Sequence, residues 1–338
     1  MCVSDTVTSR PVSRGTGTLE FLLVVAMVVV ATLLGEIALR MTGQFRPNTY
    51  PPPRLRQGLL LEAWEPYGYR LVPSTRATYL VSHNHPRAIT VVSNRDGFRA
   101  NRELGEPDVR PRVIFLGDSF VFGDGVQEPE RFTNVLETLE PSWRIDNLGM
   151  VGYGPDLMLR ALEAVGLKLK PAIVVLCIYT DDFRRVRPEY AGMGFLIPRF
   201  KLEAGHLVSV PYPTPNLWNR LDLSVAVNRV LWNYTNREWD LNHAILDRFE
   251  QLADQQPFQK AIIFLPGKDD TPADQKRRSW LRYYANSHAT AFLDLSDAIH
   301  KMGRQAFIEG NPHLNSAGNL VVAQELDRFL SGCHLPSL

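Results

Sequence analysis

The chain has 338 residues, which is long enough for one large domain or two smaller ones with a substantial buried core. Lys and Arg number 37 against 36 for Asp and Glu, so the charges nearly cancel and no nucleic-acid-binding surface is indicated. The three cysteines, Cys2, Cys177 and Cys333, have the spacing of neither a metal site nor a disulfide framework. The sequence requires no metal or organic cofactor, and we expect none.

An apolar segment near the N-terminus is the first predicted element. Residues 21–35 read FLLVVAMVVVATLLG and carry no charge, and the apolar character continues past Glu36 and Arg40, which are spaced to pair on a helix. About twenty-one residues suffice to cross a hydrocarbon core of roughly 30 Å. Because no A-x-A cleavage pattern follows, we favour a transmembrane anchor at 19–41, after a tail at 1–18, over a cleaved signal peptide or a buried soluble helix.

The charges on either side of this segment leave its orientation open. Arg10 and Arg14 precede it, and four arginines follow within a similar distance, at positions 40, 46, 54 and 56. The positive-inside rule therefore does not assign the N-terminus to the cytoplasm.

A linker and a small β-rich region come next. Residues 42–58 contain a PPP run and are typical of an extended linker. Between 59 and 110, stretches such as ATYLVS and RAITVVS are rich in Tyr, Val and Thr and are punctuated by Pro, Asn and Gly. This pattern predicts short strands that lead into the main domain.

From residue 111 the chain alternates between strands and helices. The apolar runs that predict strands are RVIFLGD (112–118), RIDNLG (144–149), AIVVLCIY (172–179), KAIIFLP (260–266) and TAFLDLS (290–296). Amphipathic patterns that predict helices lie at 155–170, 240–256, 274–288 and 316–332. Continuous apolar strands separated by amphipathic helices imply an α/β domain over 111–332, with a parallel sheet covered on both faces. Ligands of such sheets bind beyond the carboxyl ends of the strands.

One long segment, residues 183–239, interrupts this alternation. An insertion of this length is typical of a lid, a binding surface or a disordered excursion. Its aromatic side chains are suited to stacking on a sugar, although packing within a small subdomain explains them better. They include Trp218, Trp232, Tyr234 and Trp239.

Residues 113–126, VIFLGDSFVFGDGV, run from an apolar strand directly into Gly-Asp-Ser. An ordinary turn would explain these residues, but the position of Ser119 at the carboxyl end of a strand favours a nucleophile. A serine nucleophile needs a base within reach and donors for the developing oxyanion. The base that the sequence offers is His313, in EGNPHLNSAGN (309–319), just before the last predicted helix.

These segments together resemble the SGNH/GDSL hydrolases. GDSF resembles the first sequence block of that family, NLGMVGYG (147–154) resembles the second, YTDD (179–182) falls where the third block lies, and NPHLNSAG resembles the last. VVSNRDGFRAN (91–101) is also similar to an element of longer, membrane-anchored members. The resemblance covers roughly residues 90 to 330 and implies a three-layer, flavodoxin-like sandwich. Carried over residue by residue, it makes Ser119 the nucleophile, His313 the general base and then acid, and the N–H groups of Ser119 and Gly152 the oxyanion donors.

The third block departs from the family pattern. Its asparagine, a side-chain oxyanion donor in the family, is Asp181 here, and an ionised carboxylate only accepts hydrogen bonds. Asp181 would help only if a buried environment kept it protonated. The next residue, Asp182, is expected to fix the active-site loop through Arg184 or Arg185.

The acidic partner of the histidine is missing from its usual places as well. Gly310 and Asn311 stand three and two residues before His313, where the family has an acid. Asparagine can hold an imidazole but gives its cation no charge support. We expect Glu309 to substitute if the loop bends back, and otherwise a Ser-His dyad without an acid.

The resemblance implies a membrane-anchored serine esterase with its domain outside the cytoplasm. The anchor and the aromatic insertion favour O-acyl groups, acetyl above all, on a glycan or another component of the cell envelope as the substrate. An O-acyltransferase would share the first half-reaction, and a catalytically weak domain used for binding is the alternative from a different class. The sequence indicates no oligomeric state.

Overall fold

The computed structural model describes residues 16–332 except 44–53, 57–58, 82–85, 189, 191, 196, 211–220 and 257. Most of the predicted tail at 1–18, most of the predicted linker at 42–58 and Trp218 of the insertion therefore lie outside the described residues.

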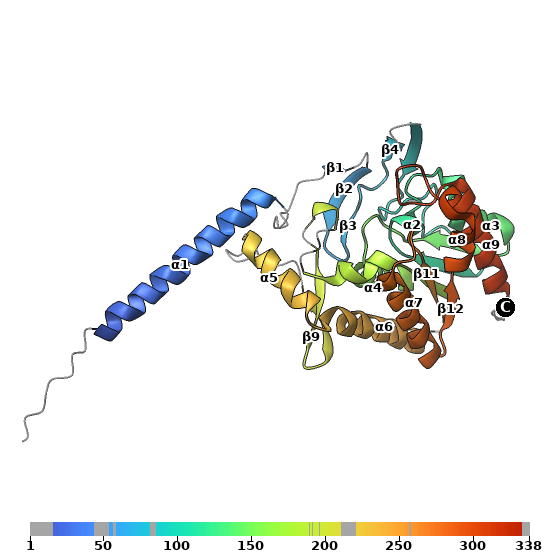
Figure 1. Cartoon of the computed structure of the whole chain (residues 1–338). Helices are drawn as coiled ribbons and strands as arrows, with labels where there is room; N and C mark the ends of the chain where they lie inside the picture. The colour runs from blue at the N-terminus through green and yellow to red at the C-terminus, as the bar shows by residue number, and fades with distance from the viewer. Residues whose placement is uncertain are drawn as a thin grey trace, which may run out of the picture. The chain divides into compact units, whose positions relative to one another are not determined.

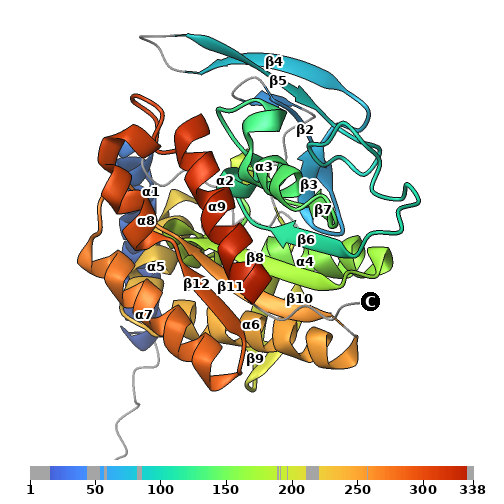
Figure 2. The ribbon, with the colours of Figure 1, turned by 90° about the vertical axis from the view of Figure 1, so that its right-hand side faces the viewer.

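The centre of the main domain is a five-stranded parallel sheet (Figures 1 and 2). Its strands lie in the order β12-β11-β8-β6-β7, and each pairs with its neighbours in parallel. Taken along the chain, this is the 2-1-3-4-5 order of flavodoxin-like sheets. The strands are β6 (Arg112–Leu116), β7 (Arg144–Asn147), β8 (Ile173–Tyr179), β11 (Gln259–Leu265) and β12 (Ala291–Asp294). The predicted parallel α/β sheet is confirmed.

Helices cover both faces of this sheet, which makes three layers (Figure 2). Alternate strand residues, such as Phe115 and Cys177, pack with α3 (Phe132–Leu139), α8 (Ser296–Met302) and α9 (Ser316–Gly332). Their neighbours pack on the opposite face with α4 (Pro155–Ala164), α6 (Arg237–Gln255) and α7 (Pro272–Ser287). Side chains of a strand alternate between faces, so a strand buried on both sides is apolar throughout, as these strands are.

The β-rich region before the main domain forms two small antiparallel sheets. One contains β1 (Arg54–Arg56), β2 (Leu59–Trp64) and β3 (Gly68–Leu71), and the other is a hairpin of β4 (Arg76–Val81) and β5 (Arg87–Val92). Buried tyrosines join the first sheet to the main domain, because Tyr69 donates to the Val151 carbonyl at 2.6 Å and Tyr153 donates to the Tyr69 carbonyl at 2.6 Å.

The insertion contributes a hairpin and a helix. The hairpin consists of β9 (Arg199–Glu203) and β10 (His206–Val210), and the helix is α5 (Asp222–Asn233). Trp239 packs among Phe183 and Trp280, with ring centroids 5.5 and 5.4 Å away, while Tyr234 is 87% exposed. Packing therefore explains Trp239, as we expected from the sequence.

The N-terminal helix α1 (Thr16–Thr42) belongs to a separate unit, whose described residues are 16–43 and 221–230. Its segment Glu20–Thr42 is by length and composition apolar enough to cross a membrane. Within this unit the buried Glu36 accepts hydrogen bonds from the N–H groups of Asp222 and Leu223, at 3.1 and 2.9 Å, and from Arg40 at 2.7 Å. Glu36 thus caps the first turn of α5, and the expected pairing with Arg40 is confirmed.

Candidate active site

The nucleophile turn connects β6 to a very short helix, α2 (Ser119–Phe122). Gly117 must be glycine because a Cβ there would lie 2.8 Å from the Cβ of Val121 and 3.3 Å from the Cys177 carbonyl oxygen. Asp118 caps the helix, since its carboxylate accepts the Phe120 N–H at 2.9 Å. Ser119 is thereby placed at the carboxyl end of a central strand, where the sequence predicted it.

His313 reaches this turn from the loop that follows α8 and leads into α9. The loop closes on itself, because the Ile308 N–H donates to the His313 carbonyl at 2.9 Å. Asn311 fixes the ring, since its side-chain oxygen accepts the His313 backbone N–H at 2.9 Å and lies 2.7 Å from Nδ1. With the Nδ1 hydrogen donated to Asn311, the other nitrogen can accept. Nε2 lies 2.8 Å from the Ser119 Oγ, so residues 194 positions apart form a hydrogen-bonded pair.

The loop that carries Gly152 runs beside the nucleophile turn. Gly152 has a φ of +77°, and a Cβ on it would lie 2.8 Å from the Tyr69 hydroxyl. Tyr190 donates to its carbonyl at 2.9 Å, which fixes the peptide plane. In the part of the chain that the structure describes, neither the Gly152 N–H nor the Ser119 N–H donates to a protein acceptor. Both donors are thus available to an oxyanion.

Close packing of these two loops gives a testable consequence at Gly149. A Cβ there would lie 2.6 Å from the Phe122 backbone nitrogen and 2.7 Å from the Val121 Cβ. We expect Gly149→Ala to separate the loops, to lower the free energy of unfolding by about 1–3 kcal/mol and to slow ester cleavage by about tenfold or more. Gly105→Ala is the matched control, because nothing lies within 4 Å of its Cβ position. Denaturant unfolding and turnover of an activated ester measure both effects, and equal behaviour of the two variants would contradict the expectation.

Asp182 is buried and connects the third block to the nucleophile turn through Arg185. Its carboxylate accepts the Tyr179 N–H at 2.9 Å and lies 2.5 Å from the Arg185 guanidinium. The same guanidinium nitrogen donates to Asp118 at 2.9 Å. Burial disfavours a charged guanidinium, but Asp182 and Asp118 more than offset it and hold the pKa of Arg185 above its usual value. Of the two arginines that the sequence offered, Arg185 makes the contact.

Asp181 lies on the outer side of the same segment. Its carboxylate pairs with Arg184 at 2.5 Å and is 3.8 Å from Arg277, and its side chain is 42% exposed. The buried environment that protonation of Asp181 requires is therefore not present, and we do not assign it a share in oxyanion binding.

Glu309, the expected substitute for the missing acid, is exposed on its loop. Of the described residues, the carboxylate found within 4 Å of the His313 ring belongs to Asp124, with its Oδ2 3.7 Å from Nδ1. Tyr79 of β4 donates to the other oxygen of Asp124 at 2.5 Å. Asp124 and Tyr79 were not identified from the sequence, and the local pattern around Asp124, Gly-Asp-Gly, is equally typical of an ordinary turn.

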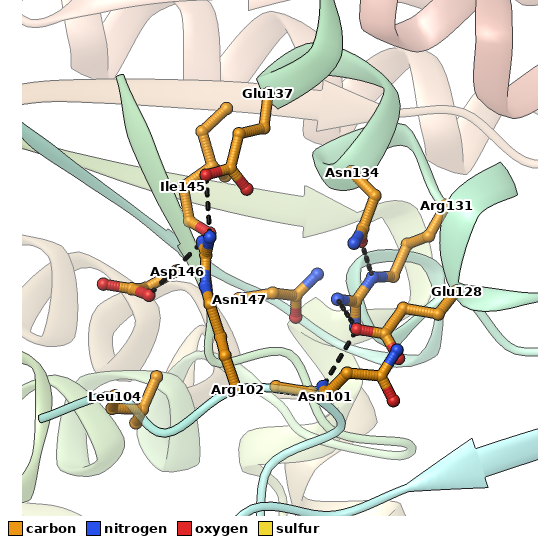
Figure 3. Close-up of a pocket in the computed structure, with 11 residues that line it drawn as sticks. Asn101, Arg102, Leu104, Glu128, Arg131, Asn134, Glu137, Ile145, Asp146 and Asn147 are labelled. Atoms are coloured by element: carbon orange, nitrogen blue, oxygen red, sulfur yellow. Dashed lines mark hydrogen bonds and ion pairs between the residues drawn. The ribbon is translucent and has the colours of Figure 1, made fainter. Parts of the chain in front are cut away.

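A separate polar cavity of about 250 Å³ lies between β7 and the start of α3 (Figure 3). Its charges are paired internally: Arg102 donates to Glu137 at 2.7 Å, and Arg131 lies 3.9 Å from Glu128. Neither Ser119 nor His313 lines it. The hydrogen-bonded serine and histidine are thus the better place for chemistry.

Comparison with known proteins adds structural neighbours. No family model and no curated protein matches this sequence. A protein assigned to the G-D-S-L lipolytic family from Desulfitobacterium hafniense aligns with a TM-score of 0.44 and 12% identity, over 65% of this chain and 99% of that chain. A psychrotrophic esterase from a Pseudoalteromonas species aligns with a TM-score of 0.42 and 13% identity, over 66% and 97% of the two chains. A mutant of an acetyl-xylooligosaccharide esterase from Geobacillus aligns with a TM-score of 0.42 and 13% identity, over 65% and 94%. TM-scores below 0.5 are too low to support a conclusion about activity. Any such conclusion depends on the geometry of Ser119 and His313.

Proposed function

We propose that this protein is a serine esterase of the SGNH/GDSL type, which removes O-acyl groups from a glycan or another component of the cell envelope. The observation that carries the proposal is the 2.8 Å separation between the Ser119 Oγ and His313 Nε2 at the carboxyl end of the parallel sheet. A hydroxyl hydrogen-bonded to a neutral imidazole nitrogen is the arrangement that activates a serine for acyl transfer.

The first half-reaction forms an acyl-enzyme. As the Ser119 Oγ bonds to the ester carbonyl carbon, its proton passes to His313 Nε2, and the carbonyl π electrons move onto oxygen. The backbone N–H groups of Ser119 and Gly152 stabilise that oxyanion. When it collapses, the bond to the alcohol oxygen breaks, and Nε2 returns the proton to the departing alcohol.

The second half-reaction regenerates the serine. Water gives a proton to His313 Nε2 as its oxygen bonds to the acyl carbon, and the Ser119 Oγ leaves with the proton that Nε2 then returns. A carboxylic acid is released.

Other features support the location and the acyl group that we propose. Helix α1 supports a membrane anchor, and we propose that the catalytic domain lies outside the cytoplasm, as the proposed envelope substrate requires. The small acetyl group suits a site in which Ser119 is only 7% exposed and Phe120 stacks on Tyr179, with ring centroids 4.4 Å apart.

Covalent labelling tests the proposal. We expect a fluorophosphonate to add one phosphonyl group to the detergent-solubilised full-length chain, because only an activated serine attacks such a reagent readily. Intact-mass measurement counts the adduct, and peptide mapping locates it on Ser119. Heat-denatured protein is the control and should remain unlabelled. A folded wild type without an adduct would instead support a binding function.

The fate of the acyl group identifies the acceptor. An acetylated xylan or peptidoglycan fragment that carries isotopically labelled acetyl groups is incubated with the enzyme and with added sugar acceptors. The labelled acetate is then measured in solution and on the acceptors. Free acetate supports the esterase, whereas acetate recovered on the acceptor would assign the chain as an O-acyltransferase.

A further inference from the structure

We propose that Asp124, on the loop that follows the nucleophile, supplies the negative charge that supports His313 during catalysis, and that Tyr79 holds it in place. This inference rests on the proposed function, because it concerns the base of that reaction. Asp124, a positioning residue outside the histidine loop, thus takes the role that the sequence led us to expect of Glu309.

The direct partner of the ring cannot supply charge. Asn311 accepts from Nδ1 at 2.7 Å, which fixes the tautomer and the orientation of His313. Its amide oxygen is neutral, however, so it gives little support to the imidazolium that forms when Ser119 loses its proton. Asn311 therefore orients the His313 ring, but the charge that would stabilise the imidazolium has to come from another residue.

Asp124 is placed to provide that charge. Its Oδ2 lies 3.7 Å from His313 Nδ1, and its side chain is 12% exposed, so solvent screens the interaction only in part. Its backbone N–H donates to the Ser119 carbonyl at 2.9 Å, so one short loop fixes both the nucleophile and the carboxylate. Gly123 and Gly125, with φ values of +76° and +86°, permit the tight path of this loop.

Tyr79 holds the carboxylate in its position. Its hydroxyl donates to the Asp124 Oδ1 at 2.5 Å and accepts the Gly125 N–H at 3.1 Å, which leaves Oδ2 facing the ring. Burial, reinforced by the adjacent Asp124, raises the pKa of the Tyr79 phenol far above its usual value, so it remains a donor. The β4–β5 hairpin carries Tyr79 and is bound to the main domain through Arg87. This arginine donates to both carboxylate oxygens of Glu130, at 2.7 and 2.8 Å.

Among the described residues, two other carboxylates near the ring are less suited to this support. Asp118, on the nucleophile turn, is neutralised by Arg185 at 2.9 Å. Glu309 is exposed on the histidine's own loop, and the face of the ring packs on Phe120, with centroids 5.2 Å apart. Asp124 is thus the carboxylate whose charge acts on Nδ1 when Nε2 takes up the Ser119 proton.

Relocating the charge tests this role. Asp124→Asn removes the charge and keeps the shape, and Asn311→Asp places a carboxylate at the 2.7 Å position while keeping both acceptor contacts of residue 311. We expect Asp124→Asn to lower kcat by about 10²-fold and to change KM by no more than about twofold. The reason is that a nearby opposite charge typically shifts the pKa of a group by about one to three units. The double variant Asp124→Asn/Asn311→Asp should have a kcat at least about tenfold higher than that of Asp124→Asn. Asp297→Asn, on the exposed surface of α8, is the matched control.

The pH–rate profile provides a readout that a purely structural role would not move. Loss of the carboxylate disfavours the protonated base, so the acid limb of kcat/KM should shift to lower pH by about one unit in Asp124→Asn and return in the double variant. Tyr79→Phe should give a smaller shift in the same direction, and it tests the proposal even if Asp124→Asn folds poorly.

The outcomes separate this inference from the proposed function. An active wild type with an unshifted Asp124→Asn profile, or a double variant as slow as Asp124→Asn, would overturn the role of Asp124 alone. A loss confined to Glu309→Gln would transfer that role to Glu309. A folded wild type that neither hydrolyses esters nor reacts with fluorophosphonate would instead refute the proposed function.

Discussion

Replacing either Ser119 or His313 by alanine is expected to lower kcat for an activated ester by about 10⁵-fold, and replacing both should cost little more. The two side chains act as one unit across the 2.8 Å hydrogen bond, because the hydroxyl is a poor nucleophile unless Nε2 takes its proton. Once either is removed, the other has no proton to give or to receive. Residual turnover would come from the oxyanion donors and from substrate binding alone.

Steady-state and single-turnover kinetics of the wild type, both single variants and the double variant measure this non-additivity. Ser142→Ala and His206→Ala, which replace an exposed serine and an exposed histidine, should match the wild type. Independent, multiplicative losses in Ser119→Ala and His313→Ala would mean that the two residues act in separate steps, and the proposed nucleophile-base pair would be wrong.

The features that sequence could predict are those set by local pattern. Apolar strand runs predicted the parallel sheet, and the position of Gly-Asp-Ser directly after a strand predicted where Ser119 would lie. Asp124 could not be found in this way, because its approach to His313 depends on how a loop 189 residues away closes. Its Gly-Asp-Gly setting is equally typical of an ordinary turn.

The choice between Arg184 and Arg185 shows a second limit. Residues Thr180–Val186 form a 3₁₀ helix, in which side chains three apart lie one above the other. Asp182 and Arg185 therefore share the buried side, and Asp181 and Arg184 share the exposed side. Sequence alone did not indicate the type of helix, so it left the two arginines equivalent and left the exposure of Asp181 unknown.

The position of Arg185 between two buried carboxylates makes it important for stability. Asp118 and Asp182, whose side chains are fully buried, both lie within 3 Å of its guanidinium. We expect Arg185→Met to lower the free energy of unfolding by about 3–5 kcal/mol at neutral pH, because it leaves two carboxylates buried without a counter-ion. Arg184→Met removes a neighbouring but solvent-exposed pair and should cost about 1 kcal/mol or less.

The loss in Arg185→Met should also depend on pH in a defined direction. Burial is the largest influence on Asp182 and raises its pKa, whereas Arg185 is the main group that lowers it. Without Arg185, Asp182 stays protonated in the folded variant at pH values where it is already ionised in the unfolded chain, that is, above the ordinary carboxylate pKa of about 4. Because the folded state then binds more protons, the stability of the variant falls as pH rises from about 4 to 8. Denaturant unfolding of the wild type and both variants at pH 5 and pH 8 measures the difference. An Arg185→Met deficit that is the same at both values would mean that the arginine acts by packing and not by neutralising Asp118 and Asp182.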